Sequence, residues 1–443
     1  MSTVANVDSA FGYRNALFSV QYAATYTVTA RANSYDAYVR GFRSAMLPHL
    51  GNTACVNYAD AAIDHPQLAY FAGNGTRLGQ IKKRYDPDGP FTQPSPSKRS
   101  KHGVPHARHH RSQGQPAVPG RMMFGAWGNP DHDDSAAIIH RALDAGINFV
   151  DTADVYSTGE SEEIVGKALK GRRDDVVLAT KAHGPMGEDV NQQGNSRRWL
   201  VQEVENSLRR LQTDWIDLYQ IHRPDPATHI DETLGALTDL VRAGKVRYIG
   251  SSTYPAGEIV EAQWVAEKRG RERFVTEQPP YSLLVRGIEA EVLPTTLRCG
   301  MGALVWSPLA GGWLSGKWRK GTDTPTSNRA ERMPARYDLS DPANQAKLDA
   351  ADALGHLADD QGMSLVHMAL AFVTEHPGVS SAIIGPRTME QLTSQLGAAE
   401  LRLSSEVLDR IDEIVPPGST INAADAGWQA PALSDPSSWR RWQ

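Results

Sequence analysis

Four polar residues with complementary proton chemistry stand at, or just beyond, the ends of short apolar runs. The runs INFVD, DVVLATK and WIDLYQIH end at Asp151, Lys181 and His222, and Tyr156 lies five residues beyond Asp151. A phenol has a pKa of about 10, which is too high for easy proton donation at neutral pH. A neighbouring ammonium lowers the pKa of the phenol, a carboxylate can hold the ammonium, and an imidazole can hydrogen-bond a carbonyl oxygen. Brought together, these side chains would protonate a carbonyl oxygen while a hydride adds to the carbon.

The elements that must position these residues alternate regularly along the chain. Apolar runs typical of buried strands begin at residues 121, 147, 175, 215, 246, 274, 303 and 381. Segments with helical spacing of apolar residues separate or follow them, among them 159–169, 196–211 and 231–242. This alternation predicts an α/β chain folded as a (β/α)₈ TIM barrel, in which chemistry is found at the C-terminal ends of the strands.

An open, doubly wound sheet would show a similar alternation of strands and helices. Such a sheet binds a dinucleotide through a GxGxxG turn after its first strand, and no such turn follows the first apolar run here. The sequence therefore favours the barrel.

The composition divides the chain into four parts. Residues 1–91 are expected to form a small α+β fragment. Residues 92–120 are rich in Pro, Ser, Gly, His and basic residues, which predicts a flexible, disordered linker. An anion or metal contact is the alternative interpretation of the basic residues and histidines in the linker. Residues 121–415 are the predicted barrel, and residues 416–443 are a tail that packs over the barrel or is loose.

Charge and cysteine content exclude several classes of protein. The 443 residues carry a formal net charge of −5, which gives no reason to expect a nucleic-acid partner. Two distant cysteines indicate neither a disulfide framework nor a zinc site. No run approaches 18 apolar residues, and the first residues do not resemble a signal peptide. We therefore expect a cytoplasmic protein that binds no metal and no membrane.

The stretch GINFVDTADVYSTGESEEIVGKAL, followed by LATK and DLYQIHRPD, resembles the aldo-keto reductases. The resemblance covers about 121–415. It implies an NADP-dependent oxidoreductase that reduces an aldehyde or ketone to an alcohol, with Tyr156 as proton donor. By position, Asp151, Tyr156, Lys181 and His222 match the catalytic tetrad of the family. A single Asp, Lys or His at a strand end is often only structural, but four in register with one family's motifs favour catalysis.

The same resemblance implies a cofactor site. In this family, a polar pair and a Gln hold the nicotinamide carboxamide, and an aromatic ring stacks on the nicotinamide. A loop, which would be residues 307–317 in this sequence, covers the pyrophosphate. Arg387 and Thr388 would bind the 2′-phosphate at a helix start, which favours NADPH over NADH. For Gln391 and Gln395, an adenosine contact and a solvated helix face are equally good interpretations. The implied cofactor residues are Gly120, Ser252, Thr253, Gln278, Trp306, Ser307, Leu309, Gly311, Ser315, Lys317, Arg387, Thr388, Gln391 and Gln395.

The sequence departs from the family at its first strand. The usual N-terminal β-hairpin is missing, and Arg121 stands where the family has Thr. Pro116 and Pro119 lack the N–H groups that a central strand needs. The first strand is therefore predicted to be altered where the linker joins the barrel.

A second resemblance lies before the linker. ACVNYADAAI and YFAGNGTRLGQIKKRYDPDGPF are similar to the C-terminal piece of berberine-bridge-type FAD-linked oxidases, over about 10–91. The sequence shows no counterpart of the FAD-binding domain of that family, so we expect a gene-fusion remnant, a mis-joined gene or a docking module for a separate flavoprotein. FAD is expected only as a remnant of that domain.

Three functions stay open at this point. The first is an NADPH-dependent reductase of a small-molecule carbonyl compound, whose identity the loop at 318–341 does not define. The second is a slow-turnover, NADPH-binding regulatory subunit, because the sequence is also similar to the branch of the family with potassium-channel β-subunits. The third is a flavin oxidoreductase fragment built on residues 1–91.

Overall fold

The computed structural model describes residues 44, 117–119, 124–323, 325 and 328–429. The chain divides into two units, Met1–Pro105 and His106–Gln443, and nearly all of the described residues belong to the second. The predicted fragment 1–91 and the linker up to Pro116 therefore lie outside the described residues, apart from Ser44, as do Gly120, Arg121 and residues 430–443.

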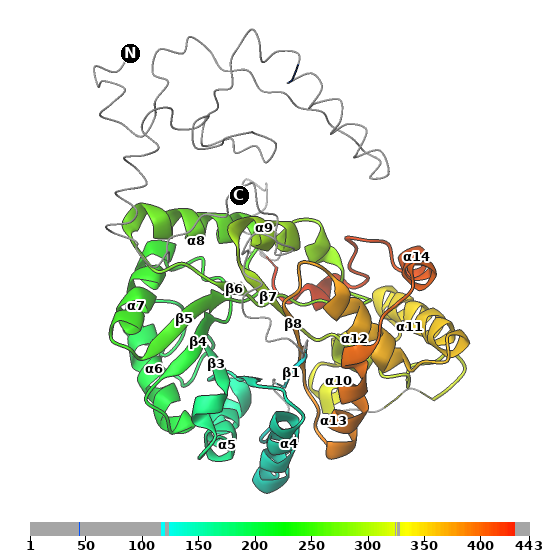
Figure 1. Ribbon diagram of the computed structural model, residues 1–443, viewed down its shortest axis with the longest axis horizontal. Coiled ribbons are helices and arrows are strands. Elements are labelled where there is room, and N and C mark those ends of the chain that lie inside the picture. The colour runs from blue at the N-terminus through cyan, green and yellow to red at the C-terminus, as the bar shows by residue number, and fades with distance from the viewer. Residues whose placement is uncertain (1–43, 45–116, 120–123, 324, 326–327, 430–443) are drawn as a thin grey trace. The chain divides into compact units, whose positions relative to one another are not determined.

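Eight parallel strands of the second unit form one sheet in the order β1-β8-β7-β6-β5-β4-β3-β2, and helices surround it (Figure 1). β1 and β2 lie in contact, although the described residues form no ladder between them, so the barrel is nearly closed. This confirms the predicted (β/α)₈ barrel. The strands are β1 (Ala117–Pro119), β2 (Phe149–Asp151), β3 (Val177–Ala182), β4 (Ile216–Ile221), β5 (Val246–Ser251), β6 (Thr276–Glu277), β7 (Gly302–Trp306) and β8 (Ser381–Ile384).

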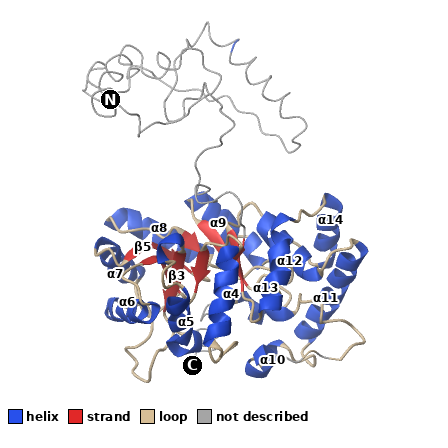
Figure 2. Ribbon diagram, turned by 60° about the horizontal axis from the view of Figure 1, so that its bottom comes forward, coloured by secondary structure: helices blue, strands red, loops and turns tan. Residues whose placement is uncertain are grey.

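The helices enclose the strands on the outside (Figure 2). Several begin at a side-chain cap, as where Ser196 accepts a hydrogen bond from the N–H of Trp199 at the start of α6. The helices are α4 (His132–Asp144), α5 (Glu160–Ala168), α6 (Arg197–Leu211), α7 (Ile230–Arg242), α8 (Ala256–Arg269), α9 (Val292–Cys299), α10 (Asn328–Arg332), α11 (Pro342–Asp360), α12 (Leu365–Glu375), α13 (Met389–Leu396) and α14 (Ser405–Ile414). The predicted helices 159–169, 196–211 and 231–242 are confirmed as α5, α6 and α7, to within a residue at each end.

The described part of the first strand lies at Ala117–Pro119, within the stretch PAVPGRMMFG from which the strand was predicted and ahead of the apolar run that begins at 121. Phe124 is paired with Asn129 in the following loop. Gly125 has φ +82°, a left-handed conformation that ends extended structure. Within the described residues, β1 forms its ladder with β8 alone, from Ala117 opposite Ala382 to Pro119 opposite Ile384.

The barrel interior is filled by side chains, so it is a packed core and not a pore. Five buried residues from four strands line it, namely Ala179, Leu218, Leu304, Trp306 and Ile383. Beyond α14, Ile421 donates its N–H to the Leu284 carbonyl at 3.2 Å, so the described part of the C-terminal segment packs on the barrel. In the described part of the chain, no helix is both long and apolar enough to cross a membrane.

Candidate active site

A buried ion pair stands at the carboxyl ends of β2 and β3. The Lys181 ammonium donates to Asp151 Oδ2 and to the Thr152 carbonyl, both at 2.6 Å. Both charged side chains are 0% exposed. A buried charge is tolerated when it is paired and hydrogen-bonded, so this geometry holds the ammonium in one position.

Tyr156 and His222 complete the group that the sequence predicted. The Tyr156 hydroxyl lies 3.5 Å from His222 Nε2, and the two rings meet edge to face. The Lys181 ammonium lies 5.0 Å from the centre of the Tyr156 ring. The Tyr156–His222 distance is at the upper limit for a hydrogen bond, and such contacts often shorten when a substrate binds. The structure thus brings all four residues together at the barrel mouth.

The strand register explains why these side chains converge. Lys181 of β3 stands opposite Gln220 of β4, and successive side chains of a strand point to opposite faces. Gln220 and His222 are two residues apart, so they project to the same side as Lys181. Parallel strands end at the same side of a sheet, which places Asp151 beside them.

Two glutamine side chains complete the hydrogen bonds of Asp151. Its Oδ1 accepts from Gln220 Nε2 at 3.1 Å and from Gln278 Nε2 at 2.9 Å. Gln278 was among the predicted cofactor residues, whereas the sequence interpretation missed Gln220. A polar residue two positions before His222, within an otherwise apolar run, is the signal that would have found it.

The turn that carries Tyr156 is strained. Ser157 and Thr158 have φ of 49° and 56°, and Gly159 follows at 96°. A left-handed conformation costs a non-glycine residue roughly 1–2 kcal/mol, so the surroundings must hold it. Ser157 does so by donating its hydroxyl to the Phe124 carbonyl at 3.2 Å and accepting the Trp127 N–H at 3.1 Å. The loop after β1 therefore fixes the position of Tyr156.

The predicted carboxamide-binding residues lie at the ends of β5 and β6. The Ser252 hydroxyl donates to the Gln278 carbonyl at 2.9 Å and lies 3.3 Å from the Thr253 hydroxyl. Within the described residues, Gln278 Oε1 is buried and has no hydrogen-bond partner. A buried acceptor of this kind is costly unless a donor reaches it, and the N–H of a carboxamide is such a donor.

A buried carboxyl group supports this part of the mouth. Glu277 accepts hydrogen bonds from the Ser251 hydroxyl at 2.5 Å and from the Tyr254 N–H at 3.1 Å. Burial raises the pKa of Glu277 to about 7, and these hydrogen bonds oppose the rise. Glu277 therefore ties β5 to β6 directly behind Ser252 and Thr253.

The loop after β7 offers backbone groups to an anion. Trp306 ends β7 and is 6% exposed, and Gly311 donates its N–H to Ser307 Oγ at 3.0 Å. Ser307, Ala310, Gly311 and Gly312 all have positive φ, as in backbone turns that hold phosphate. Leu309 directly precedes the short helix Ala310–Gly312, and Ser315 and the exposed Lys317 follow it.

The predicted 2′-phosphate residues stand at the start of α13, after β8. The Thr388 hydroxyl caps this helix by accepting the Gln391 N–H at 3.3 Å, and Gln391 Oε1 accepts the Arg387 N–H at 2.8 Å. Gln395 is only 8% exposed, so the interpretation as a solvated helix face is wrong for this residue. Of all the predicted site residues, only Gly120 lies outside the described residues.

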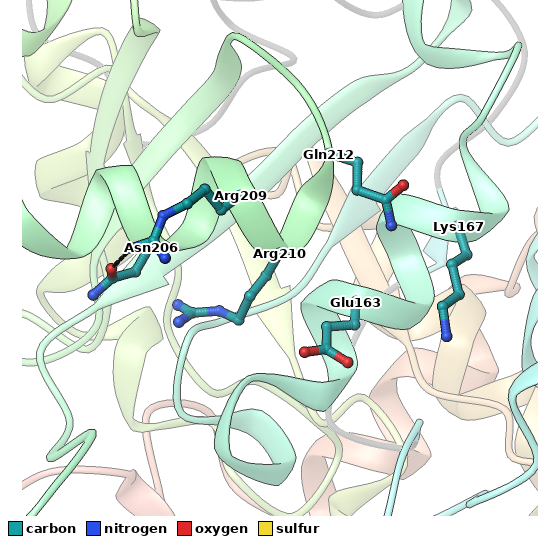
Figure 3. A pocket seen from close by; sticks show the side chains of 6 residues that line it. All are labelled: Glu163, Lys167, Asn206, Arg209, Arg210 and Gln212. Atoms are coloured by element: carbon teal, nitrogen blue, oxygen red, sulfur yellow. Dashed lines mark hydrogen bonds between the residues drawn. The ribbon is translucent and has the colours of Figure 1, made fainter.

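A separate groove lies on the outer surface between α5 and α6 (Figure 3). It has a volume of about 330 Å³ and is lined by Glu163, Lys167, Asn206, Arg209, Arg210 and Gln212. None of the four residues at the barrel mouth lines this groove, so it is not the reaction site.

Comparisons with known proteins agree with this geometry. The model of the aldo/keto reductase family matches residues 118–416, and that of the berberine and berberine-like family matches residues 54–96. An uncharacterised oxidoreductase, YrpG of Bacillus subtilis, is 42% identical over 309 residues, covering 67% of this chain and 91% of its own. A probable voltage-gated potassium channel subunit beta of rice is 35% identical, covering 67% and 92%. The aldo-keto reductase YhdN of B. subtilis is 37% identical, covering 68% and 87%.

The berberine-like match begins within the predicted fragment 10–91 and extends five residues into the predicted linker. The reductase match begins inside β1, so the barrel starts slightly before the predicted boundary at 121. With a nearly closed parallel barrel, four converging side chains at its mouth and relatives matched over most of their length, the chain belongs to the aldo/keto reductase family.

Proposed function

We propose that the barrel is an NADPH-dependent reductase of aldehydes or ketones. The observation that carries the proposal is the phenol of Tyr156, set between His222 and the buried Lys181 that Asp151 holds. When NADPH is bound, it supplies the hydride. Tyr156 then gives its proton to the carbonyl oxygen, because the nearby ammonium stabilises the phenolate that is left. His222 hydrogen-bonds the same oxygen and orients the substrate.

The residues around the mouth fit this cofactor. Gln278 Oε1 would accept from the nicotinamide carboxamide, beside Ser252 and Thr253, and Trp306 would stack on the ring. The Ser307–Lys317 loop would cover the pyrophosphate with its backbone N–H groups. Arg387 and Thr388 at the start of α13 would bind a 2′-phosphate, which supports NADPH over NADH.

The proposal is tested by titrating the full chain with NADPH and, in parallel, NADH, while protein fluorescence is recorded. We expect strong quenching with NADPH, because Trp306 would lie against the nicotinamide, and weaker binding of NADH. A panel of aldehydes and ketones then gives turnover. Binding of neither nucleotide would refute the proposal.

A second candidate function is a slow-turnover regulatory subunit that binds NADPH. The relatives named as channel β-subunits favour it. It predicts tight NADPH binding with no turnover on the same panel, whereas a reductase turns over at least one class of carbonyl compound.

A flavin function rests on residues 54–96 alone. It predicts that the purified chain is yellow and releases FAD on denaturation. A docking role for this segment predicts that the chain co-purifies with a separate flavoprotein instead.

A further inference from the structure

A second buried ionic group lies behind the turn that carries Tyr156, and the proposed reaction does not use it. It consists of Asp154 after β2, Glu162 on α5, and Glu203 and Arg210 on α6; we call it the acid cluster. Its three acidic residues are each 0% exposed.

The two glutamates of the acid cluster are fully hydrogen-bonded. Arg210 Nε donates to Glu162 Oε2 at 2.6 Å, and Arg210 Nη2 donates to Glu203 Oε1. The Thr180 hydroxyl donates to Glu162 Oε1 at 2.6 Å, and Asn206 Nδ2 donates to Glu203 Oε2 at 2.7 Å. All four carboxylate oxygens thus have donors.

Asp154 differs from its two acidic neighbours. Its Oδ1 accepts the Val155 N–H at 2.6 Å, but within the described residues its buried Oδ2 has no hydrogen-bond partner. The one cation of the acid cluster, Arg210, already binds both glutamates. A third buried negative charge without a cation is far more costly than a neutral carboxylic acid.

The groups that face Asp154 favour the neutral form. The charges of Glu162 on α5 and of Glu203 and Arg210 on α6 act on Asp154, and the charge of Asp154 in turn acts on the buried Tyr219 of β4. Burial raises the pKa of Asp154 well above its usual range, and the two glutamates raise it further, while Arg210 opposes them. The pKa of Tyr219 is raised for the same reasons, so Tyr219 does not supply a charge.

A residue of the acid cluster stands at each end of the Tyr156 turn. At its start, the Asp154 N–H donates to the carbonyl of Lys181 at 3.1 Å. At its end, a Cβ on Gly159 would lie 2.8 Å from Cδ of Arg210, so this arginine packs directly on the turn. Figure 3 shows Arg210 extending from α6 toward α5. The strained residues 157 and 158 lie between these two supports.

We propose that Asp154 is a positioning residue for Tyr156: its buried carboxyl group, through the hydrogen bond from the Val155 N–H to Oδ1, fixes the start of the turn and keeps the phenol beside Lys181 and His222. The inference deepens the proposed function and rests on it, because Tyr156 is the proposed proton donor. No contact described in the structure joins the Asp154 side chain to the mouth itself, so it acts through the turn.

The test compares Asp154→Asn and Asp154→Ala in the full chain, with the exposed Asp174→Asn as matched control and Tyr156→Phe as reference. For each variant, kcat, KM and the pH profile of kcat are measured with an aldehyde that the wild type reduces, and the Kd of NADPH is measured by fluorescence. The asparagine is isosteric with a neutral acid and keeps the acceptor for the Val155 N–H. It should retain kcat within about threefold and keep the wild-type pH profile.

Asp154→Ala loses the oxygen that accepts the Val155 N–H. We expect kcat to fall about 30-fold, since small misplacements of reacting groups cost up to about 10²-fold, and the alkaline limb of the profile to shift. The Kd of NADPH should stay within about twofold, because Asp154 lies outside the cofactor contacts.

Full activity of Asp154→Ala would overturn the inference. An altered pH profile of kcat in Asp154→Asn would also overturn the inference. This second measurement tests the inference even if the alanine variant does not fold. If Tyr156→Phe turns over like the wild type, the proposed function itself fails, whatever the Asp154 variants do.

Discussion

Two of the buried ionic groups in the described part of the chain differ in charge balance. At the mouth, one ammonium faces one carboxylate, and two glutamine amides take the remaining oxygen of Asp151. In the acid cluster, the guanidinium of Arg210 binds Glu162 and Glu203, and no described ion pair gives the third acid, Asp154, a cation. A matched pair keeps its charges when buried, whereas an excess acid takes up a proton. The first arrangement suits chemistry, and the second suits holding a strained turn in place.

The largest effect is expected from breaking the matched pair with Lys181→Met. Asp151 would be left as a buried charge without a cation, so the free energy of unfolding should fall by about 3–5 kcal/mol. The kcat for carbonyl reduction should fall on the order of 10³-fold, because the phenol loses its ammonium. Chemical denaturation and steady-state turnover measure both, with the exposed Lys170→Met as control.

The double variant Lys181→Met/Asp151→Asn sharpens this prediction. Replacing the unpaired Asp151 carboxylate should recover much of the lost free energy of unfolding but none of the activity. Recovered activity would show that the ion pair is only structural.

Arg210→Met breaks the acid cluster and should have the next largest effect. Two buried glutamates lose their cation, so the free energy of unfolding should fall by about 3 kcal/mol. The loss should be smaller at acidic pH, where the glutamates bind protons, whereas Arg209→Met on the exposed side of the same helix should change little. A pH-independent loss would contradict the charge balance described above.

Asp154→Asn is expected to raise stability at neutral and alkaline pH. The folded state binds the Asp154 proton more tightly than the unfolded state, so the wild type loses stability as pH rises above the ordinary Asp pKa and through the raised one. Asparagine does not titrate, so the variant should lack this decrease of stability with rising pH. The variant should gain on the order of 1–2 kcal/mol above the raised pKa and nothing in acid, as measured by denaturation across pH. A loss of stability at alkaline pH would show that the carboxylate is favourable.

The smallest effect is expected from Gln220→Leu. Asp151 Oδ1 loses one of its two amide donors and keeps the shorter bond from Gln278. Stability should fall by about 1 kcal/mol and kcat by a few-fold. The exposed Gln202→Leu is the control, and a loss as large as that of Lys181→Met would mean that Gln220 takes part in the reaction.

Strand positions could be predicted where apolar runs are long and end in turns. The run at 274–278 gives only Thr276–Glu277 as β6, because Pro279 and Pro280 have no N–H to continue the ladder. For the first strand, the apolar run RMMFG points to residues 121–125, whereas the described pairing with β8 begins earlier, at Ala117–Pro119.

The four residues at the mouth could be predicted because they end strands and share the spacing of one family. Gln220 was missed although its position two residues before His222 offered a signal. The role of Asp154 could not be predicted, since it depends on burial and on charges from elements far apart in sequence. Nothing in the motif DTADVY shows that one aspartate has a cation and the other has none.

The central claim, that the four residues at the barrel mouth perform carbonyl reduction, is tested most directly by comparing the wild type with Tyr156→Phe. NADPH oxidation is followed in a stopped-flow instrument at saturating aldehyde, and NADPH binding is measured separately. We predict that Tyr156→Phe binds NADPH as the wild type does and oxidises it at least about 10²-fold more slowly, as expected for loss of a general acid. Equal rates would contradict the account.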